Sequence, residues 1–209
     1  MKQPFWVFAI ILLFEILIVL ILIPGDHTNL CIEREMGYIE ESLGIQSKDW
    51  VTEKANDWYQ STIIDSGVYT GTYQILIPSE NERIRSRGME NMGTAWFQLV
   101  SNRIEATFRV VYQFLMRLAL LVTWAPYMLI LLVPAIFDGM MTRSIKQTNF
   151  DYASPIVHRY SVRGSIILLF GLIITFFAPM ALNPIIIPVV LMITSVLCGT
   201  AWANLQKRI

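Results

Sequence analysis

Apolar residues gather in four long runs along the chain, and polar or charged stretches separate them. The runs are residues 5–23, 113–137, 165–182 and 185–204. Each is near the roughly 20 residues that a helix needs to cross a bilayer. Asn183-Pro184 separates the last two runs and predicts a tight hairpin, because proline disfavours a helical residue before it. The pattern predicts an all-α polytopic membrane protein with four transmembrane helices.

The polar segment between the first two runs, residues 24–112, is predicted to be mainly helical. Asn29–Leu43 and Lys48–Ile63 show amphipathic spacing, and Ser47 is expected to cap the second of these helices. Gly67–Ile77 is instead rich in residues that favour strands, so it predicts a short hairpin or an extended linker.

A long helix is expected to carry the chain into the second membrane run. Between Trp96 and Leu118, apolar residues recur every three or four positions, and no proline interrupts them. The predicted helix extends from about residue 90 to residue 137, with bends near Pro126 and Pro134. Its first part forms a helical stalk outside the membrane.

Charge predicts the orientation of the helices. Residues 24–108 contain seven Lys or Arg against thirteen Asp or Glu, whereas residues 138–164 contain four basic residues against two acidic ones. Short basic loops remain in the cytoplasm. We therefore expect residues 1–4, the loop 138–164 and the tail 205–209 inside, which places both termini in the cytoplasm and 24–112 outside. In a bacterium this membrane is the inner one.

Composition favours a membrane protein without enzymatic activity. The chain has 209 residues, of which 55% are hydrophobic and 15% charged, and its formal net charge is zero. A balanced charge gives no basic surface for nucleic acid, so no direct contact with it is expected. No nucleotide-binding loop, catalytic triad or metal-ligand spacing is present, so no catalytic residue, cofactor or metal is predicted. Cys31 is expected to be a free thiol, with a bridge to a second copy as the alternative.

Glu15 is the only charged residue within the first apolar run. A carboxylate near the middle of a membrane costs about 2.5–3.5 kcal/mol on insertion scales, so it is expected to face protein. Its best basic partner is Arg117, at the edge of the second run, and the Thr123 hydroxyl is another candidate. This pattern favours helix association over transport.

A stripe of small residues marks the last run. Ser195, Gly199 and Ala203 recur at spacings of four, which permits close approach of another helix. Packing against the third run of the same hairpin is favoured over a homo-oligomer.

The stretch PAIFDGMMTR, residues 134–143, closes the second run. Asp138 is expected where the chain leaves the lipid, with Gly139 as a left-handed helix cap. A carboxylate is disfavoured by the dipole at a helix C-terminus, so Asp138 needs a basic partner. The candidates are Arg143, His158 and Arg159. The stretch is thus interpreted as the hinge of a docking loop.

From Pro134 onward the chain resembles the integrating conjugative element membrane proteins, a family encoded with bacterial conjugation genes. The resemblance rests on PAIFDGMMTR, on ASPIVHRY at 153–160, and on the hairpin that follows. Ser154 and His158 match residues of the family pattern, while Val157 stands where the family often has tyrosine. The resemblance implies an accessory protein of conjugative DNA transfer, encoded beside the coupling protein. That protein is the ATPase that feeds DNA to a type IV secretion channel.

Three functions compete at this point. The first is a non-enzymatic inner-membrane accessory subunit that associates with the coupling protein or with other type IV secretion membrane components. The second is an exclusion protein that blocks redundant transfer into a recipient cell. The third is a sensor that binds a ligand through its outer segment. Membrane lipids and a second copy of the chain are further expected partners.

Overall fold

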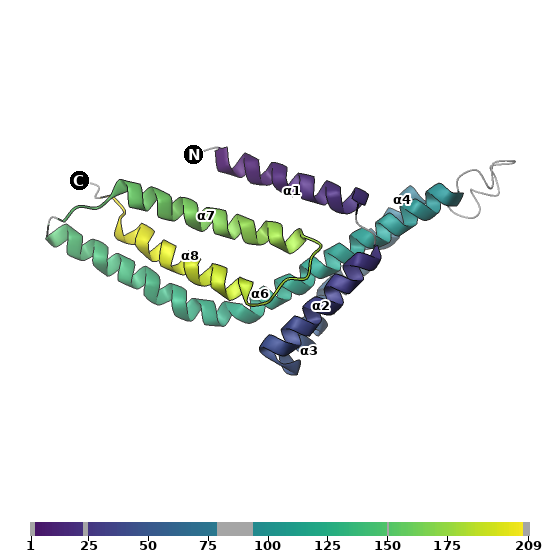
Figure 1. Cartoon of the computed structure of the whole chain (residues 1–209), viewed down its shortest axis with the longest axis horizontal. Helices are drawn as coiled ribbons and strands as arrows, with labels where there is room; N and C mark the ends of the chain where they lie inside the picture. Colours follow the sequence, from purple (N-terminus) through teal and green to yellow (C-terminus); the bar gives the residue numbers. More distant parts are fainter. Residues whose placement is uncertain (1–2, 23–24, 79–93, 150, 207–209) are drawn as a thin grey trace. The chain divides into compact units, whose positions relative to one another are not determined.

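The described parts of the chain fold into helices (Figure 1). In the computed structural model, residues 3–22, 25–78, 94–149 and 151–206 are described, and no strand occurs among them. The helices are α1 (Gln3–Leu22), α2 (Gly25–Leu43), α3 (Ile45–Tyr59), the π-helix η1 (Gln60–Ile64), α4 (Val68–Leu76), α6 (Thr94–Thr148), α7 (Pro155–Phe177) and α8 (Ile186–Ala203). The predicted all-α class is confirmed.

Among the described residues, three helices are long and apolar enough to cross a membrane. They are the α6 segment Trp96–Thr148, α7 and α8. Trp6–Val19 of α1 is also an apolar helix, and the side chains on either side of it lie outside the described residues. The protein therefore has membrane-helix character in three helices, whereas a fourth crossing by α1 and the outer placement of residues 24–112 remain predictions.

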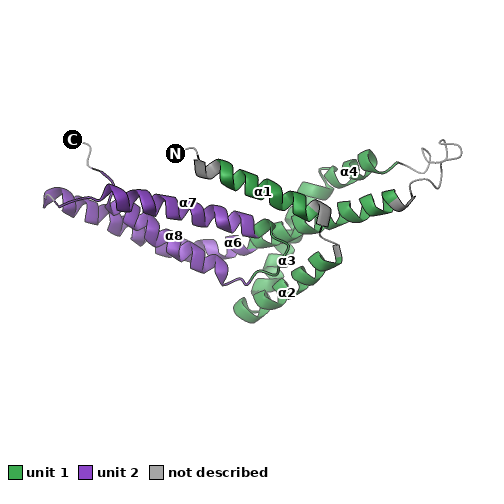
Figure 2. Cartoon of the chain, turned by 45° about the horizontal axis from the view of Figure 1, so that its top comes forward, with its two compact units in different colours: residues 1–119, 176–182 green, residues 120–175, 183–209 purple. Residues whose placement is uncertain are grey.

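The chain divides into two compact units (Figure 2). The first comprises residues 1–119 with 176–182, and the second comprises residues 120–175 with 183–209. We call them unit 1 and unit 2. Helix α6 contributes its first part to unit 1 and its remainder to unit 2.

The core of unit 1 forms on one face of α2. Its buried residues recur at three- and four-residue intervals: Thr28, Cys31, Ile32, Glu35 and Ile39. Two residues of α3 one turn apart, Val51 and Ala55, are fully buried as well.

Gly44 connects α2 to α3 with a positive φ of 82°, which favours glycine because it has no Cβ. Its N–H donates to Glu40 O at 3.0 Å. The predicted cap at Ser47 is wrong, because α3 begins two residues earlier, at Ile45. The Ser47 hydroxyl donates instead to Leu43 O at 3.0 Å.

Gly67–Ile77 was expected as a hairpin or extended linker, and the structure corrects this prediction, since α4 covers Val68–Leu76. Tyr69 and Tyr73 lie one turn apart on this helix, with ring centroids at 4.9 Å, and Tyr69 also packs on Phe108 of α6 at 4.9 Å. Packing of aromatic side chains at helical spacing thus overrides their strand preference. The hydrogen bond with Tyr73 and burial raise the pKa of Tyr69 to about 12, so its phenol is neutral.

In unit 2, α8 packs closely against α6. A Cβ at Gly199 would lie 2.5 Å from the carbonyl oxygen of Ala135, and Gly139 faces the backbone of Gly199 in the same way. Ser195, one turn before Gly199, is buried and donates to Leu191 O within its own helix at 2.9 Å. The small-residue stripe was expected to meet the third run, but at Gly199 it meets the second.

Helix α7 packs on α8 through other residues. Thr200 donates to the Ser161 hydroxyl oxygen at 3.0 Å, and a Cβ at Gly164 would lie 3.1 Å from Leu197 Cδ1. The two helices run alongside each other in Figure 1.

The expected helix end at Gly139 is wrong. Helix α6 continues through Asp138 and Gly139 to Thr148, and Gly139 does not have a positive φ. Gly139 has no side chain, and this allows α6 to contact the backbone of Gly199. It does not form a left-handed helix cap. Because α7 already begins at Pro155, the expected loop of 138–164 shortens to a connection of residues 149–154.

We predict that Gly199→Ala destabilises unit 2. The added methyl group meets backbone of α6, which cannot rotate away as a side chain could, and such overpacking costs about 1–3 kcal/mol. Gly171→Ala in α7 is the matched control, because a Cβ there meets nothing within 4 Å. Thermal unfolding in mild detergent should show a lower midpoint for Gly199→Ala alone. Equal midpoints for the two variants would contradict the close packing.

Candidate functional site

Arg117 of α6 is completely buried within unit 1, and all five of its N–H donors have acceptors. Its Nε lies 2.9 Å from Glu35 Oε1, and its Nη2 lies 3.0 Å from Glu35 Oε2. Its Nη1 donates to Phe176 O at 2.8 Å and to Ala178 O at 2.7 Å, and its Nη2 also donates to Met180 O. The guanidinium therefore joins a carboxylate to three backbone carbonyls.

The acceptors come from two other parts of unit 1. Glu35 belongs to the buried face of α2, whereas Phe176, Ala178 and Met180 lie at the end of α7 and just after it. The last carbonyls of a helix lack partners within the helix, and a cation there also opposes the negative end of the dipole. Arg117 thus satisfies Phe176 O in the last turn of α7 and also binds the carbonyls of Ala178 and Met180 just after the helix.

Gln113, one turn before Arg117 on α6, completes this cluster. Its amide nitrogen donates to Glu35 Oε2 at 2.9 Å and to Met180 O at 3.3 Å. The three side chains Glu35, Gln113 and Arg117, which we call the arginine cluster, are each at most 1% exposed. The cluster fixes α2, α6 and the segment after α7 to one another within unit 1.

The sequence predicted Arg117 as the basic partner of Glu15, whereas the ion pair of Arg117 in the structure is with Glu35. Glu15 interacts electrostatically with Arg117, yet Glu35 makes the bidentate contact. Glu15 Oε2 is buried and has no hydrogen-bond partner among the described residues. A signal for Glu35 was present, because it lies on the same helical stripe as Cys31, Ile32 and Ile39.

A second polar cluster ties the ends of the unit 2 helices together around Asn204, which directly follows α8. Its Oδ1 accepts from Lys146 Nζ of α6 at 3.1 Å and from the Ser154 N–H at 3.4 Å. Its Nδ2 donates to Thr200 O at 2.9 Å. One side chain therefore joins α6, the connection 149–154 and α8, and nothing in the sequence pattern singled it out.

Ser154 and His158 hold the first turn of α7. The Ser154 hydroxyl accepts from the Val157 N–H at 3.4 Å, which is an N-cap arrangement, and Pro155 occupies the first helical position. His158 Nδ1 lies 2.7 Å from Ala201 O of α8. A carbonyl only accepts, so Nδ1 carries the proton.

The expected partners of Asp138 do not contact it in the part of the chain that the structure describes. Asp138 is exposed and belongs to no ion pair there. His158 bonds to Ala201 instead, Arg159 is exposed, and Arg143 keeps a buried Nε without a hydrogen-bond partner. The connection is therefore held by Asn204 and His158 rather than by a hinge at Asp138.

Neither cysteine contributes to a metal site in the described parts of the chain. No group of three or more His, Cys, Asp or Glu side chains there could hold an ion. Cys31 is buried, with its Sγ 3.5 Å from Pro179 O and 3.6 Å from His27 Nδ1, and both Cys31 and Cys198 are free thiols.

We predict that Glu35→Gln strongly destabilises unit 1. The substitution leaves the buried Arg117 charge uncompensated, and breaking such a pair costs about 3–5 kcal/mol. Glu33→Gln, on the exposed side of the same helix, should leave stability unchanged. Thermal unfolding of the two variants in detergent tests this, and a midpoint of Glu35→Gln equal to that of Glu33→Gln would contradict it.

We also predict that Asn204→Leu loosens the connection 149–154. Loss of the acceptor for Lys146 and Ser154 removes the contacts that hold the connection to α8, so chymotrypsin should cleave faster after Tyr152, which is 77% exposed. Asn149→Ala is the control, because that side chain is exposed and has no hydrogen bond among those described. Equal cleavage rates in both variants would refute the role of Asn204.

Comparison of the sequence with known proteins identifies the family to which the chain belongs. No protein of curated function and no solved structure matches the chain. The family described as IncC plasmid conjugative DNA transfer protein DtrJ-like matches residues 9–207, a range that includes the arginine cluster and the Asn204 cluster. The resemblance to a conjugation-associated family is thereby confirmed. The chain belongs to the DtrJ-like family of conjugative DNA transfer proteins.

Proposed function

We propose that this protein is a non-enzymatic inner-membrane accessory subunit of a conjugative type IV secretion system and that it associates with the coupling ATPase. The observation that carries the proposal is the family match over residues 9–207 in a chain whose described residues include three helices apolar enough to span a membrane. In this proposal both termini and the connection 149–154 face the cytoplasm, in keeping with the basic residues around it.

The buried polar groups support a structural rather than a catalytic use. Every donor of Arg117 is occupied by protein acceptors, and His158 Nδ1 is occupied by Ala201 O. A general acid or nucleophile needs a group that is free to meet a substrate. These groups instead fix helices to one another, as expected of a subunit that presents a defined surface to a partner.

We assign the partner contact to α1. Large apolar side chains are exposed around this helix, among them Trp6, Ile10, Leu13, Phe14 and Leu17. Glu15 lies among them and is half-buried. A carboxylate at membrane depth favours association with a neighbouring helix, since that helix can supply a hydrogen-bond donor. The membrane region of the coupling ATPase is the proposed neighbour of α1.

Deletion of the gene in donor cells should strongly reduce transfer, and expression of the full chain should restore it. Mating assays with the deletion in donor or in recipient cells measure this. Normal transfer from the deleted donor, together with more frequent redundant transfer into the deleted recipient, would contradict the accessory role and favour an exclusion protein.

Affinity purification from mild detergent should recover the coupling ATPase in a fixed ratio, and Glu15→Gln should weaken that recovery because it removes a charged acceptor. The exposed Glu33→Gln is the matched control. A homo-oligomer without the ATPase would contradict the proposed partner, and unchanged recovery with Glu15→Gln would contradict the α1 contact.

A further inference from the structure

Helix α7 has two faces of different character. One face packs within the protein, through His158 bonded to Ala201 O, Ser161 bonded to Thr200, and Ser165 3.8 Å from Cys198. Leu172 continues this buried face toward the end of the helix. The opposite face is exposed.

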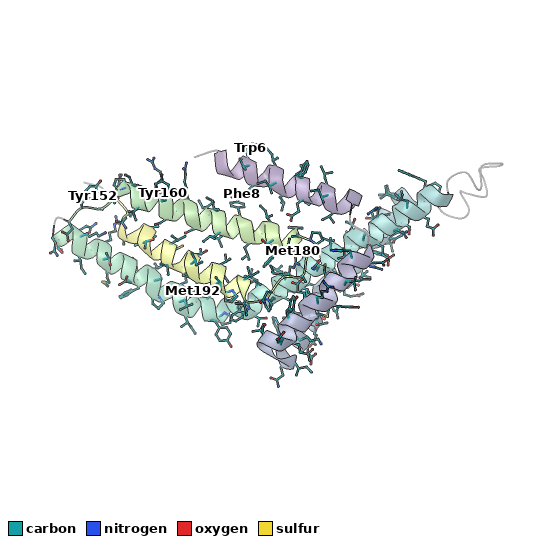
Figure 3. All side chains as sticks on the ribbon, in the orientation of Figure 1. Trp6, Phe8, Tyr152, Tyr160, Met180 and Met192 are labelled. Atoms are coloured by element: carbon teal, nitrogen blue, oxygen red, sulfur yellow. The ribbon has the colours of Figure 1, made fainter. Side chains whose placement is uncertain are left out.

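The exposed face combines two arginines with aromatic and aliphatic side chains: Ile156, Arg159, Tyr160, Arg163 and Ile167. At about 100° per residue these five positions fall within an arc of roughly 100°. The exposed fractions are 65% for Ile156, 68% for Tyr160 and 51% for Ile167. Figure 3 labels Tyr160, together with Tyr152 of the preceding connection. We call these five residues the α7 outer stripe.

The two guanidinium groups of the stripe have no counter-charge within the described residues. Arg159 and Arg163 are exposed, and neither has an ion-pair or hydrogen-bond partner in the described parts of the chain. Helix α7 contains no acidic residue. Like charges one helical turn apart repel each other, so an anion between them would be favourable.

The stripe lies where an apolar segment begins. No charged residue occurs from Gly164 to Gln206, so Arg163 is the last charge before the apolar part of α7. Gly164–Phe177 is about 21 Å long at 1.5 Å per residue, which is shorter than a hydrocarbon core of roughly 30 Å. A segment shorter than the core places Arg163 at or just inside the hydrocarbon boundary, from where its long side chain can extend to the phosphate layer. Tyr160 fits the same boundary, where tyrosine is enriched.

From this arrangement we propose that the α7 outer stripe binds the headgroup of an anionic phospholipid. Arg159 and Arg163 hold the phosphate through paired N–H donors, Tyr160 borders the headgroup, and an acyl chain lies along Ile167. Guanidinium groups suit phosphate because they present two parallel donors. A lipid fits better than an acidic protein segment because aliphatic residues lie on both sides of the arginines on the same face.

The test uses the full-length protein in mild detergent, with phosphatidylglycerol or phosphatidylcholine as the added probe. Phosphatidylglycerol should raise the unfolding midpoint and remain bound in native mass spectrometry, whereas phosphatidylcholine should do neither. The double variant Arg159→Gln/Arg163→Gln should bind phosphatidylglycerol on the order of thirtyfold more weakly. The double variant Arg159→Lys/Arg163→Lys should retain part of the preference, because it keeps the charge and loses the paired donors.

Arg34→Gln is the control, since Arg34 is an exposed arginine of α2 outside the stripe. The glutamine variants should fold normally because both arginines are exposed, and their unfolding midpoints without lipid check this. Equal binding of the two lipids, or unchanged phosphatidylglycerol binding by the glutamine variant, would overturn the proposal. Complete displacement by inorganic phosphate would show a site for a free anion. Normal lipid binding with lost capture of the coupling ATPase would assign the stripe to a protein partner.

Discussion

The ion pair between Arg117 and Glu35 is the interaction on which the architecture of unit 1 depends. Neither side chain is exposed to solvent, so each charge has lost its hydration and must be compensated inside the protein. The geometry supplies that compensation, because the guanidinium donates to the carboxylate and to three carbonyls, and Gln113 donates to the carboxylate as well. A buried charge of this kind requires acceptors at hydrogen-bonding distance and in the correct direction. It therefore fixes which part of α2 and which turn after α7 meet α6.

A different interaction holds the helices of unit 2 together. Its helices approach closely because Gly139 and Gly199 have no side chains, so backbone contacts backbone. Lipid offers little hydrophobic drive for association between helices, and close packing with interhelical hydrogen bonds takes its place. The bonds of Asn204 and His158 lie at the ends of these helices and hold the short connection there. A defined connection and a defined outer face of α7 are what a partner or a lipid can recognise.

Several features were predictable because they depend on local spacing alone. The apolar recurrence after Trp96 predicted a long helix, and Asn183-Pro184 predicted the break before α8. The predictions of secondary structure were wrong where tertiary packing overrode the local conformational preference of the residues. Tyr69 and Tyr73 favour a strand in isolation, but they form a helix that packs on Phe108. Gly139 resembles a helix cap in sequence, but it serves as a contact point for Gly199.

The sequence by itself determined the helical class, the membrane character and the membership in a conjugative transfer family, since these follow from hydrophobic length and from motif residues along the chain. It also marked Arg117 as the best basic partner for the carboxylate of Glu15. Only the tertiary structure decided that Glu35, 82 positions away, supplies it rather than Glu15. The physical reason is that periodicity shows which face of a helix is buried. Which buried faces then meet depends on the three-dimensional match of donors to acceptors, and the pattern of a single helix does not contain that match.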